Sequence, residues 1–368
     1  MKKLEKLTII LIFLIIVNLM LGFTYPSTSA ESAVLIDSKT GRVIYSSNHN
    51  LRRPVASTTK IMTALLAIEY GDLYSIVKVK DSAIGVEGSS IYLAKGEEIL
   101  LKDLVYGLML RSGNDAAVAI AEHISGSVDK FVNLMNEKAK NIGASNTNFV
   151  NPHGLHDPNH FSTAYDLAII TREAMKTDFF RDVSKTKTWV ADREINQYFS
   201  NKNDVVWEYK GGDGVKIGYT KAAGRCLVAS ATRDEIQLIA VVINDGNWFN
   251  DSYRMLDYGF DNFKPSLLLS KNQFLKKVEL LNGDIDFLNL VYEDDLIIPL
   301  NEEEKEKIKI LLDIPDSMNA PIYKGQKLGS IQVFLEGKLL YTSEVKSTIE
   351  IKKYKPKSNF RNFIKSFF

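Results

Sequence analysis

The sequence has little cysteine. Its 368 residues contain a single one, Cys226, which excludes an internal disulfide framework and a cysteine-based zinc site. Cys226 lies in the apolar run CLVASA, a position that favours a buried structural thiol. Neither covalent cross-linking nor thiolate metal ligation is therefore expected.

The chain also lacks a marked excess of charge, internal repeats and low-complexity segments. It carries 46 basic and 45 acidic residues, a net charge of +1. The chain therefore has no bulk attraction for nucleic acid, and a polyanionic partner is not expected. Its length is sufficient for two domains that each bury a core.

The N-terminal segment has the organisation of a secretory signal. The basic stretch MKKLEK precedes an apolar run over residues 8–23, and Thr28 and Ala30 occupy the small-residue positions before a cleavage site. We expect a signal peptide over residues 1–30, cleaved after Ala30. The alternative is an uncleaved membrane anchor, for which the apolar run is short. In either case the rest of the chain works outside the cytoplasm.

Residues 31–263 are expected to form one α/β domain. Strand-like runs lie near both of its ends, and segments with apolar residues at helical spacing lie between them. This arrangement predicts one sheet built from distant segments, with helices packed on it. The expected strands are residues 33–38, 42–47, 226–233 and 236–244, and the expected helical runs are 60–70, 101–124 and 128–143.

Residues 264–353 change to short alternating strands separated by turns. The clearest of these strand patterns are residues 276–283, 285–293 and 330–345. They predict a small all-β, sandwich-like domain that carries no chemical motif.

The C-terminal tail, residues 354–368, is basic and aromatic. The last 18 residues of the chain contain six basic residues and no acidic one. As a helix, the tail would present a stripe suited to an anionic lipid interface, which predicts membrane contact. The alternatives are a frayed tail or a stripe packed on the β domain. The stripe residues are Phe360, Phe363, Ile364, Phe367 and Phe368.

Ser57 is the candidate nucleophile. It stands in RRPVASTTKIMTALL with Lys60 three residues later, so at the start of a helix the amine can reach the hydroxyl. Helix N-terminal amides near the serine can help to hold an oxyanion. A lysine with an ordinary pKa of about 10.4 acts as a base near neutral pH only when burial or a second cation lowers that pKa. The apolar run after Lys60 supplies the burial, and Lys216 could supply the cation.

A Ser-Gly-Asn break interrupts two apolar helical runs at residues 112–114. It would place the hydroxyl of Ser112 and the carboxamide of Asn114 on a tight loop inside the domain. An isolated break of this kind is more often a helix cap with a glycine turn. Ser-x-x-Lys is also a weak signal alone, because this chain contains four other instances.

Lys216, in GVKIGYT, supplies the third element. Lys39 stands in a similar triplet, Lys39-Thr40-Gly41, but this triplet precedes the candidate nucleophile and lies where a hairpin turn would join two strands. We interpret the Lys39 triplet as that turn. The three remaining motifs follow the order typical of serine β-lactamases and penicillin-binding proteins: Ser57-x-x-Lys60, Ser112-x-Asn114 and Lys216-x-Gly218.

On these motifs the chain resembles the low-molecular-weight penicillin-binding proteins, which are serine-type D-alanyl-D-alanine carboxypeptidases. The resemblance covers residues 31–263 and includes RPVASTTKIMTALLA, GLMLRSGNDAAVAIAEHISG, NPHGLHDPNHFSTAYDLA and GVKIGYTKAAGRCLVASATR. The β domain and the tail resemble the family's C-terminal parts more loosely. The resemblance implies the serine β-lactamase and penicillin-binding-protein transpeptidase fold.

The resemblance also implies catalytic roles. Ser57 would attack the carbonyl of the penultimate D-alanine of a peptidoglycan stem peptide, and Lys60 would take the proton of Ser57. Ser112 would relay a proton to the departing D-alanine, and Asn114 would hold Lys60 and the substrate amide. Lys216 would keep the local field positive and steer the terminal carboxylate. β-Lactams would acylate Ser57 by the same attack, and no metal or other cofactor is needed.

Substrate contacts are implied along the strand that carries Lys216. Gly218, Tyr219 and Thr220 would line the substrate beside Lys216, and the backbone amides of Ser57 and Tyr219 would form the oxyanion hole.

Two positions depart from the family pattern. Ile217 stands where members usually have a threonine whose hydroxyl helps to bind the substrate carboxylate. Trp248 stands where many carry an arginine, and Arg254 follows six residues later. Two carboxylate contacts are therefore expected to be missing, and Thr220 could substitute in part.

Three alternatives stay open. His153, His156 and His160 lie close together in the sequence and could hold zinc, although their loop lacks the helical scaffold of a typical histidine pair. A β-lactamase would share the three motifs but would need a dedicated deacylating carboxylate. A wall-binding protein without catalysis is the third alternative, motivated by Ile217 and Trp248.

Overall fold

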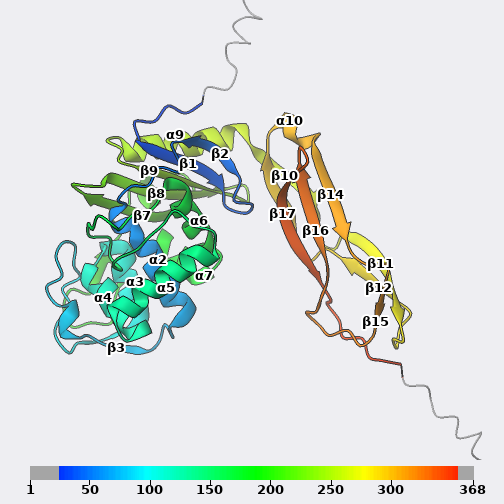
Figure 1. Ribbon diagram of the computed structural model, residues 1–368, viewed down its shortest axis with the longest axis horizontal. Helices are drawn as coiled ribbons and strands as arrows, with labels where there is room; N and C mark the ends of the chain where they lie inside the picture. The colour runs from blue at the N-terminus through cyan, green and yellow to red at the C-terminus, as the bar shows by residue number, and fades with distance from the viewer. Residues whose placement is uncertain (1–24, 355–368) are drawn as a thin grey trace, which may run out of the picture. The chain divides into compact units, whose positions relative to one another are not determined.

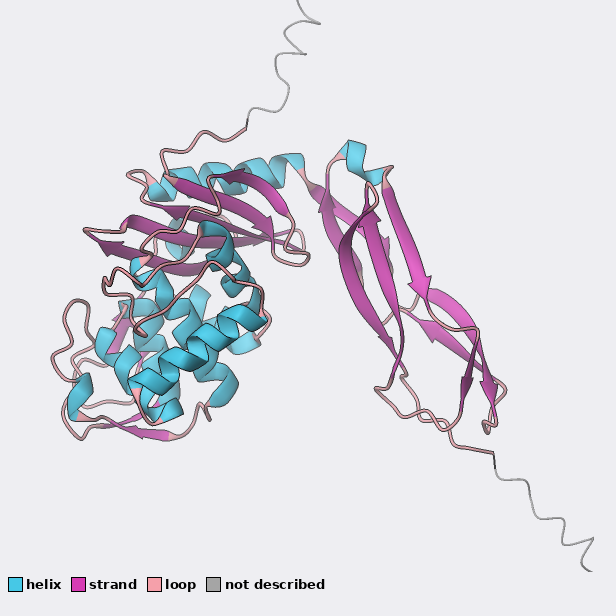
Figure 2. Ribbon diagram, viewed as in Figure 1, coloured by secondary structure: helices cyan, strands magenta, loops and turns pink. Residues whose placement is uncertain are grey.

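The computed structural model describes residues 25–354, which form two compact units (Figures 1 and 2). Within that range the first unit holds residues 25–233 and 237–261, and the second holds residues 234–236 and 262–354. The first unit combines helices with a sheet, and the second is built mainly from strands. The predicted fold class, α/β followed by a small all-β domain, is confirmed.

A five-stranded sheet is the framework of the first unit, in the order β2-β1-β9-β8-β7. Strand β1 pairs antiparallel with both β2 and β9, so segments about 200 residues apart in the sequence are neighbours, as predicted. Lys39 lies in the turn between β1 and β2. Strand β7 pairs with β8 and forms one edge of the sheet. The strands are β1 (Ser32–Asp37), β2 (Val43–Ser47), β7 (Gly212–Thr220), β8 (Gly224–Arg233) and β9 (Ile236–Ile243).

Helices cover both faces of this sheet, with α9 on one face and α2 to α7 gathered on the opposite side (Figure 1). They are α2 (Lys60–Tyr70), α3 (Leu101–Tyr106), α4 (Asn114–Ser125), α5 (Val128–Asn141), α6 (Ala164–Ala174), α7 (Asp178–Lys185), α8 (Val205–Glu208) and α9 (Trp248–Asn262). Short helical turns are η1 (Ala56–Thr59), η2 (Asp81–Ala83) and the π-helical η3 (Gly107–Arg111). Small two-stranded sheets join β3 (Ile76–Lys78) to β4 (Glu98–Leu100) and β5 (Thr188–Val190) to β6 (Tyr198–Ser200).

Helix α2 lies at the centre of the core. Residues 60–67 are all buried, as expected for a segment that is apolar on nearly every face. On the other face of the sheet, Gly259 lets α9 approach closely, because a Cβ there would lie 2.4 Å from the side chain of Leu238. The sheet is therefore sandwiched between α9 and the helical core around α2.

The predicted helical run over residues 101–124 is interrupted where the Ser-Gly-Asn motif indicated. Helix α3 continues into η3, Ser112 adopts a left-handed φ of 64°, and α4 begins at Asn114. Helix α6 was not among the expected helices, although Thr163 caps it by accepting a hydrogen bond from the backbone of Asp166.

The second unit contains three small sheets around its own apolar core, which includes Val278, Ile298, Ile331 and Val333. One short helix, α10 (Glu302–Lys305), interrupts the strands. The strands are β10 (Lys264–Leu269), β11 (Phe274–Leu281), β12 (Phe287–Val291), β13 (Leu296–Leu300), β14 (Ile308–Asp313), β15 (Ser317–Asn319), β16 (Lys327–Leu335) and β17 (Lys338–Lys346).

The apolar run of the predicted signal peptide and the aromatic stripe of the predicted tail lie outside the described residues. Between residues 25 and 354, no helix has the length and apolarity needed to cross a membrane. Ser29, which belongs to the predicted signal peptide, is described. Its backbone N–H donates to the carboxylate of Asp251 at 2.6 Å, and its hydroxyl donates to that of Asp245 at 2.5 Å. Both aspartates are buried.

Candidate active site

Ser57 and Lys60 meet at the start of the central helix. Ser57 lies in η1, and Lys60 is the first residue of α2, so the i, i+3 spacing brings Lys60 Nζ to 3.0 Å from Ser57 Oγ. The amine also donates to Asn114 Oδ1 and to the backbone carbonyl of His153, each at 2.7 Å. The Lys60 side chain is fully buried. Its nitrogen therefore has three fixed neighbours and no access to bulk solvent.

The environment of Lys60 favours the neutral amine. Burial lowers its pKa well below the ordinary value, and the positive charge of Lys216 lowers it further. Asp115 acts in the opposite direction but does not reverse the shift. Lys216 is also buried, and burial together with the nearby charge of Lys202 lowers its pKa to about 7.

The Ser-Gly-Asn turn brings its two polar side chains into the same region. Asn114 is buried, and while its Oδ1 accepts from Lys60, its Nδ2 donates to the carbonyl of Glu87 at 2.5 Å. The hydroxyl of Ser112 makes no hydrogen bond to any residue between 25 and 354. It is therefore available to a bound molecule.

Strand β7 passes directly beside Ser57, the candidate nucleophile. A Cβ placed on Gly218 would lie 2.8 Å from the amide nitrogen of Ser57, so the two backbones are in close contact. Alternation along the strand puts Lys216, Gly218 and Thr220 on one face. Tyr219 is 63% exposed, and the Thr220 hydroxyl accepts a hydrogen bond from the backbone of Ala223. The face of β7 that carries Lys216 and Gly218 therefore packs against Ser57.

The backbone before Ser57 is also tightly enclosed. Ala56 has a left-handed φ of 49°, and a Cβ on Gly154 would lie 1.9 Å from the Ala56 carbonyl oxygen. Thr59 donates its hydroxyl to that same carbonyl at 2.8 Å. The turn that presents Ser57 is thus held from several sides.

Two of the three histidines of the loop, His153 and His160, are engaged in local hydrogen bonds. His153 Nδ1 accepts from the backbone of Leu155, and His160 Nδ1 accepts from that of Val150. His160 Nε2 lies 2.8 Å from the Thr59 hydroxyl. Burial lowers the pKa of His153 to about 3 and that of His160 to about 4, so both rings are neutral. No group of three or more potential metal ligands occurs in the described part of the chain.

Sequence comparison decides the family to which this site belongs. Residues 22–247 match the D-alanyl-D-alanine carboxypeptidase family, and residues 263–353 match the C-terminal domain of penicillin-binding protein 5. The chain belongs to the D-alanyl-D-alanine carboxypeptidase family. The predicted resemblance is therefore confirmed.

Relatives of the D-alanyl-D-alanine carboxypeptidase family match over most of both chains. The carboxypeptidase DacF of Bacillus subtilis is 37% identical over 356 residues, covering 91% of this chain and 88% of the relative. DacA of Haemophilus influenzae is 32% identical, with 87% and 85% covered. The crystal structure of penicillin-binding protein 5 from Haemophilus influenzae superposes with a TM-score of 0.71 at 30% identity, covering 90% of this chain and all of that one.

Ile217 and Trp248 are the two positions expected to depart from the carboxypeptidase pattern. Ile217 is partly exposed on the edge strand, on the face opposite to Lys216. Trp248 begins α9, and its ring lies 5.8 Å from the guanidinium of Arg225. Arg254 forms an ion pair with buried Asp251 and is thereby occupied. Arg225 donates to the carbonyl of Gly246 and has no carboxylate partner within residues 25–354.

Lys202 and Arg225 are the cations near the site that the sequence reasoning missed. Lys202 lies in a loop without a recognisable motif, and its backbone N–H donates to the carbonyl of Leu110. Arg225 stands opposite Tyr219 in the register of β7 and β8, which a hairpin alignment could have identified.

A cavity of about 580 Å³, lined by residues 94–98 and 192–195, includes none of the candidate catalytic side chains.

Proposed function

We propose that this protein is a serine carboxypeptidase that removes the terminal D-alanine from peptidoglycan stem peptides ending in D-Ala-D-Ala. The observation that carries the proposal is the separation of 3.0 Å between the buried Lys60 amine and the Ser57 hydroxyl. A serine next to a lysine that burial and a second cation keep neutral has the means to lose its proton and attack a carbonyl carbon.

The hydrogen bonds of Lys60 support its role as the base. A neutral amine has two N–H donors and one lone pair. The acceptors at 2.7 Å, Asn114 Oδ1 and the His153 carbonyl, take the two donors. The lone pair then faces Ser57, whose hydroxyl donates to it.

The reaction would proceed through an acyl-enzyme. Ser57 Oγ bonds to the carbonyl carbon of the penultimate D-alanine as its proton passes to Lys60, and the amides of Ser57 and Tyr219 hold the oxyanion. The C–N bond then breaks, and Ser112 relays a proton from Lys60 to the departing amine of D-alanine. Water hydrolyses the ester, which releases the shortened stem peptide and restores Ser57.

Positive charge beside the edge strand would bind the substrate carboxylate. Lys216 supplies it from within the site, and Gly218, Tyr219 and Thr220 line the substrate next to Lys216. β-Lactams carry a carboxylate and a strained amide, so they would acylate Ser57 by the same route. Signal-directed export and a C-terminal tail on the membrane surface would place this activity at the extracytoplasmic face, where peptidoglycan is found.

Mass spectrometry after incubation with penicillin tests the proposal. We expect an adduct on the tryptic peptide that contains Ser57, and D-alanine release from D-Ala-D-Ala peptides by the same preparation. Ser57→Ala should abolish both. An adduct on Ser112, or acylation retained in Ser57→Ala, would contradict the assignment.

The same measurement separates the alternative functions. Rapid release of hydrolysed penicillin without D-alanine release would identify a β-lactamase. The absence of any adduct on the wild-type protein would favour a wall-binding protein without catalysis.

A further inference from the structure

The loop over residues 87–97 determines the orientation of Asn114. Asn114 Nδ2 donates to the Glu87 carbonyl at 2.5 Å, and its backbone N–H donates to the Ser89 carbonyl at 2.7 Å. Gly88, at a φ of 94°, lies so close that a Cβ would be 2.8 Å from Asn114 Nδ2. Because the loop holds the nitrogen of the carboxamide, it also directs Oδ1 toward Lys60.

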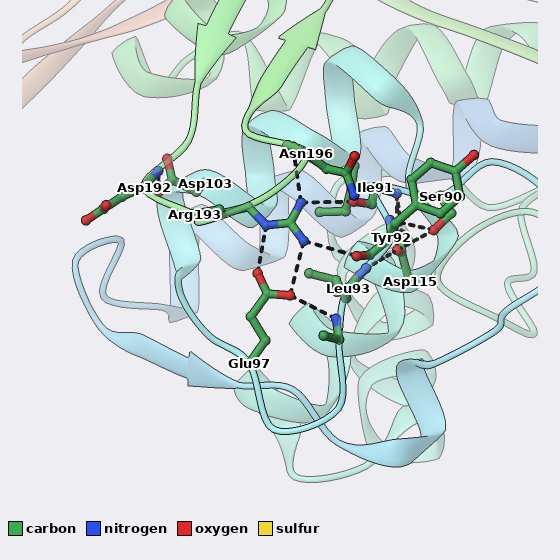
Figure 3. Close-up of polar contacts among 11 residues, drawn as sticks. Ser90, Ile91, Tyr92, Leu93, Glu97, Asp103, Asp115, Asp192, Arg193 and Asn196 are labelled. Carbon is green, nitrogen blue, oxygen red and sulfur yellow. Dashed lines mark hydrogen bonds and ion pairs between the residues drawn. The ribbon is translucent and has the colours of Figure 1, made fainter.

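The loop has little regular structure of its own, and a buried carboxylate holds its amides. Asp115 accepts from the hydroxyl of Ser90 at 2.6 Å and from the backbone N–H groups of Ile91 and Leu93 at 3.1 Å (Figure 3). Asp115 is 2% exposed and follows Asn114 directly in the chain. One side of the loop is thus fixed to the beginning of α4.

A guanidinium from a distant hairpin holds the carbonyls of the same loop. Arg193, in the turn between β5 and β6, donates to the carbonyls of Ile91 and Tyr92 at 2.9 and 3.2 Å (Figure 3). It forms two further bonds with the carboxylate of Glu97, at 2.7 and 3.1 Å, and one with the Asn196 carbonyl. The side chain is 1% exposed, and all five of its N–H donors are used.

The hairpin that carries Arg193 is itself anchored. Asp103 of α3 accepts from the Trp189 indole at 2.7 Å and from the backbone of Asp192 at 3.0 Å. The Trp189 ring stacks on Tyr106 with centroids 3.7 Å apart. Arg193 is therefore a fixed point against which the loop can be held.

We propose that Arg193 is a positioning residue for the active site. It holds residues 91–97 against Asp115, the loop then holds the carboxamide of Asn114, and Asn114 orients the amine of Lys60 toward Ser57. Arg193 contacts neither Ser57 nor Lys60 in this arrangement. The proposal relies on the proposed function only for its kinetic consequence, because the order of the loop can be measured without any reaction.

Arg193→Ala tests this, with Arg172→Ala as the matched control. Arg172 also binds backbone carbonyls of a loop, those of Ser38 and Lys39 at 2.8 Å, but far in sequence from residues 87–97. We expect Arg193→Ala to slow acylation of Ser57 by penicillin roughly ten- to hundredfold, since small displacements of catalytic groups are costly. Amide hydrogen exchange should accelerate at Ile91 and Leu93. Arg172→Ala should change neither property.

Arg193→Lys and Glu97→Ala complete the design. Lysine keeps the charge but lacks the planar fork, so acylation should recover only in part. Glu97→Ala removes the carboxylate partner of Arg193 and should slow acylation of Ser57 less than Arg193→Ala does. This variant tests the proposal even if Arg193→Ala does not fold. Equal acylation rates in Arg193→Ala and Arg172→Ala would overturn the proposal, as would slow acylation with unchanged exchange over residues 87–97. Absence of acylation in the wild type would instead count against the proposed function.

Discussion

Gly218 and the amide nitrogen of Ser57 are in such close contact that a Cβ on Gly218 would lie 2.8 Å from that nitrogen. The backbone of the edge strand β7 therefore packs directly against the backbone of Ser57. The amide of Ser57, which we propose as an oxyanion donor, keeps its place only while position 218 has no side chain.

Gly218→Ala should lower kcat/KM on a D-Ala-D-Ala peptide by about a hundredfold, because the added methyl displaces the Ser57 amide. Steady-state kinetics at saturating and limiting substrate would measure the loss. Gly246→Ala is the matched control, since a Cβ there meets nothing within 4 Å. Equal kinetics for the two variants would contradict the proposed use of this contact.

Lys202→Gln should shift the pH dependence of kcat/KM. In the proposed mechanism the acid limb reports Lys60, which must be neutral to act as the base, and the alkaline limb reports Lys216, whose pKa is about 7. Burial is the main cause of that low pKa, and the charge of Lys202 is the second. Removing this charge raises the pKa of Lys216, so the alkaline limb moves to higher pH. Lys202→Arg keeps the charge and should leave the limb in place.

Ile217→Thr should raise kcat/KM on peptides with a free C-terminal carboxylate. A hydrogen bond to a charged group is worth about 1.5–3 kcal/mol, which corresponds to roughly ten- to hundredfold in efficiency. Analogues with a blocked carboxylate should gain less. Equal or absent gains would mean that other groups hold the carboxylate. Arg225, rather than the ion-paired Arg254, is then the next residue to substitute.

Removal of residues 354–368 should move the protein from membrane to soluble fractions and leave activity on soluble peptides unchanged. Stable attachment needs two cooperating signals, here the aromatic stripe and the basic residues. Replacing the five stripe residues by serine retains every basic residue and should give the same shift. If the truncated protein, processed at its N-terminus, still sediments with membranes, the tail is not the anchor.

A chain that begins at Glu31 should be less stable than one that begins at Tyr25. Cleavage after Ala30 removes the hydrogen bonds of Ser29 to buried Asp245 and Asp251. Each such bond to a charged group contributes about 1.5–3 kcal/mol to the free energy of unfolding. Urea denaturation of the two chains measures the difference, and Ser29→Ala in the longer chain should lose part of it. N-terminal sequencing of the exported protein would identify which chain is the natural one.

The sequence predicts this site unevenly, for physical reasons. The approach of Lys60 to Ser57 follows from helical spacing, and the break at Ser112 follows from its Ser-Gly-Asn turn. The contacts of Asn114 with the loop do not follow, because backbone carbonyls at Glu87 and Ser89 carry no residue-type signature. Arg193 was missed for the same reason: two of its four partners are backbone carbonyls about 100 residues away in the chain.

The single cysteine can also serve as a chemical probe of the sheet. Cys226 is fully buried on β8, directly opposite Gly218, and burial raises the pKa of its thiol to about 11. A thiol reagent can therefore alkylate it only when the packing around β8 opens. The rate of alkylation then reports how often this part of the domain, next to the strand that contacts Ser57, opens, and no label has to be introduced.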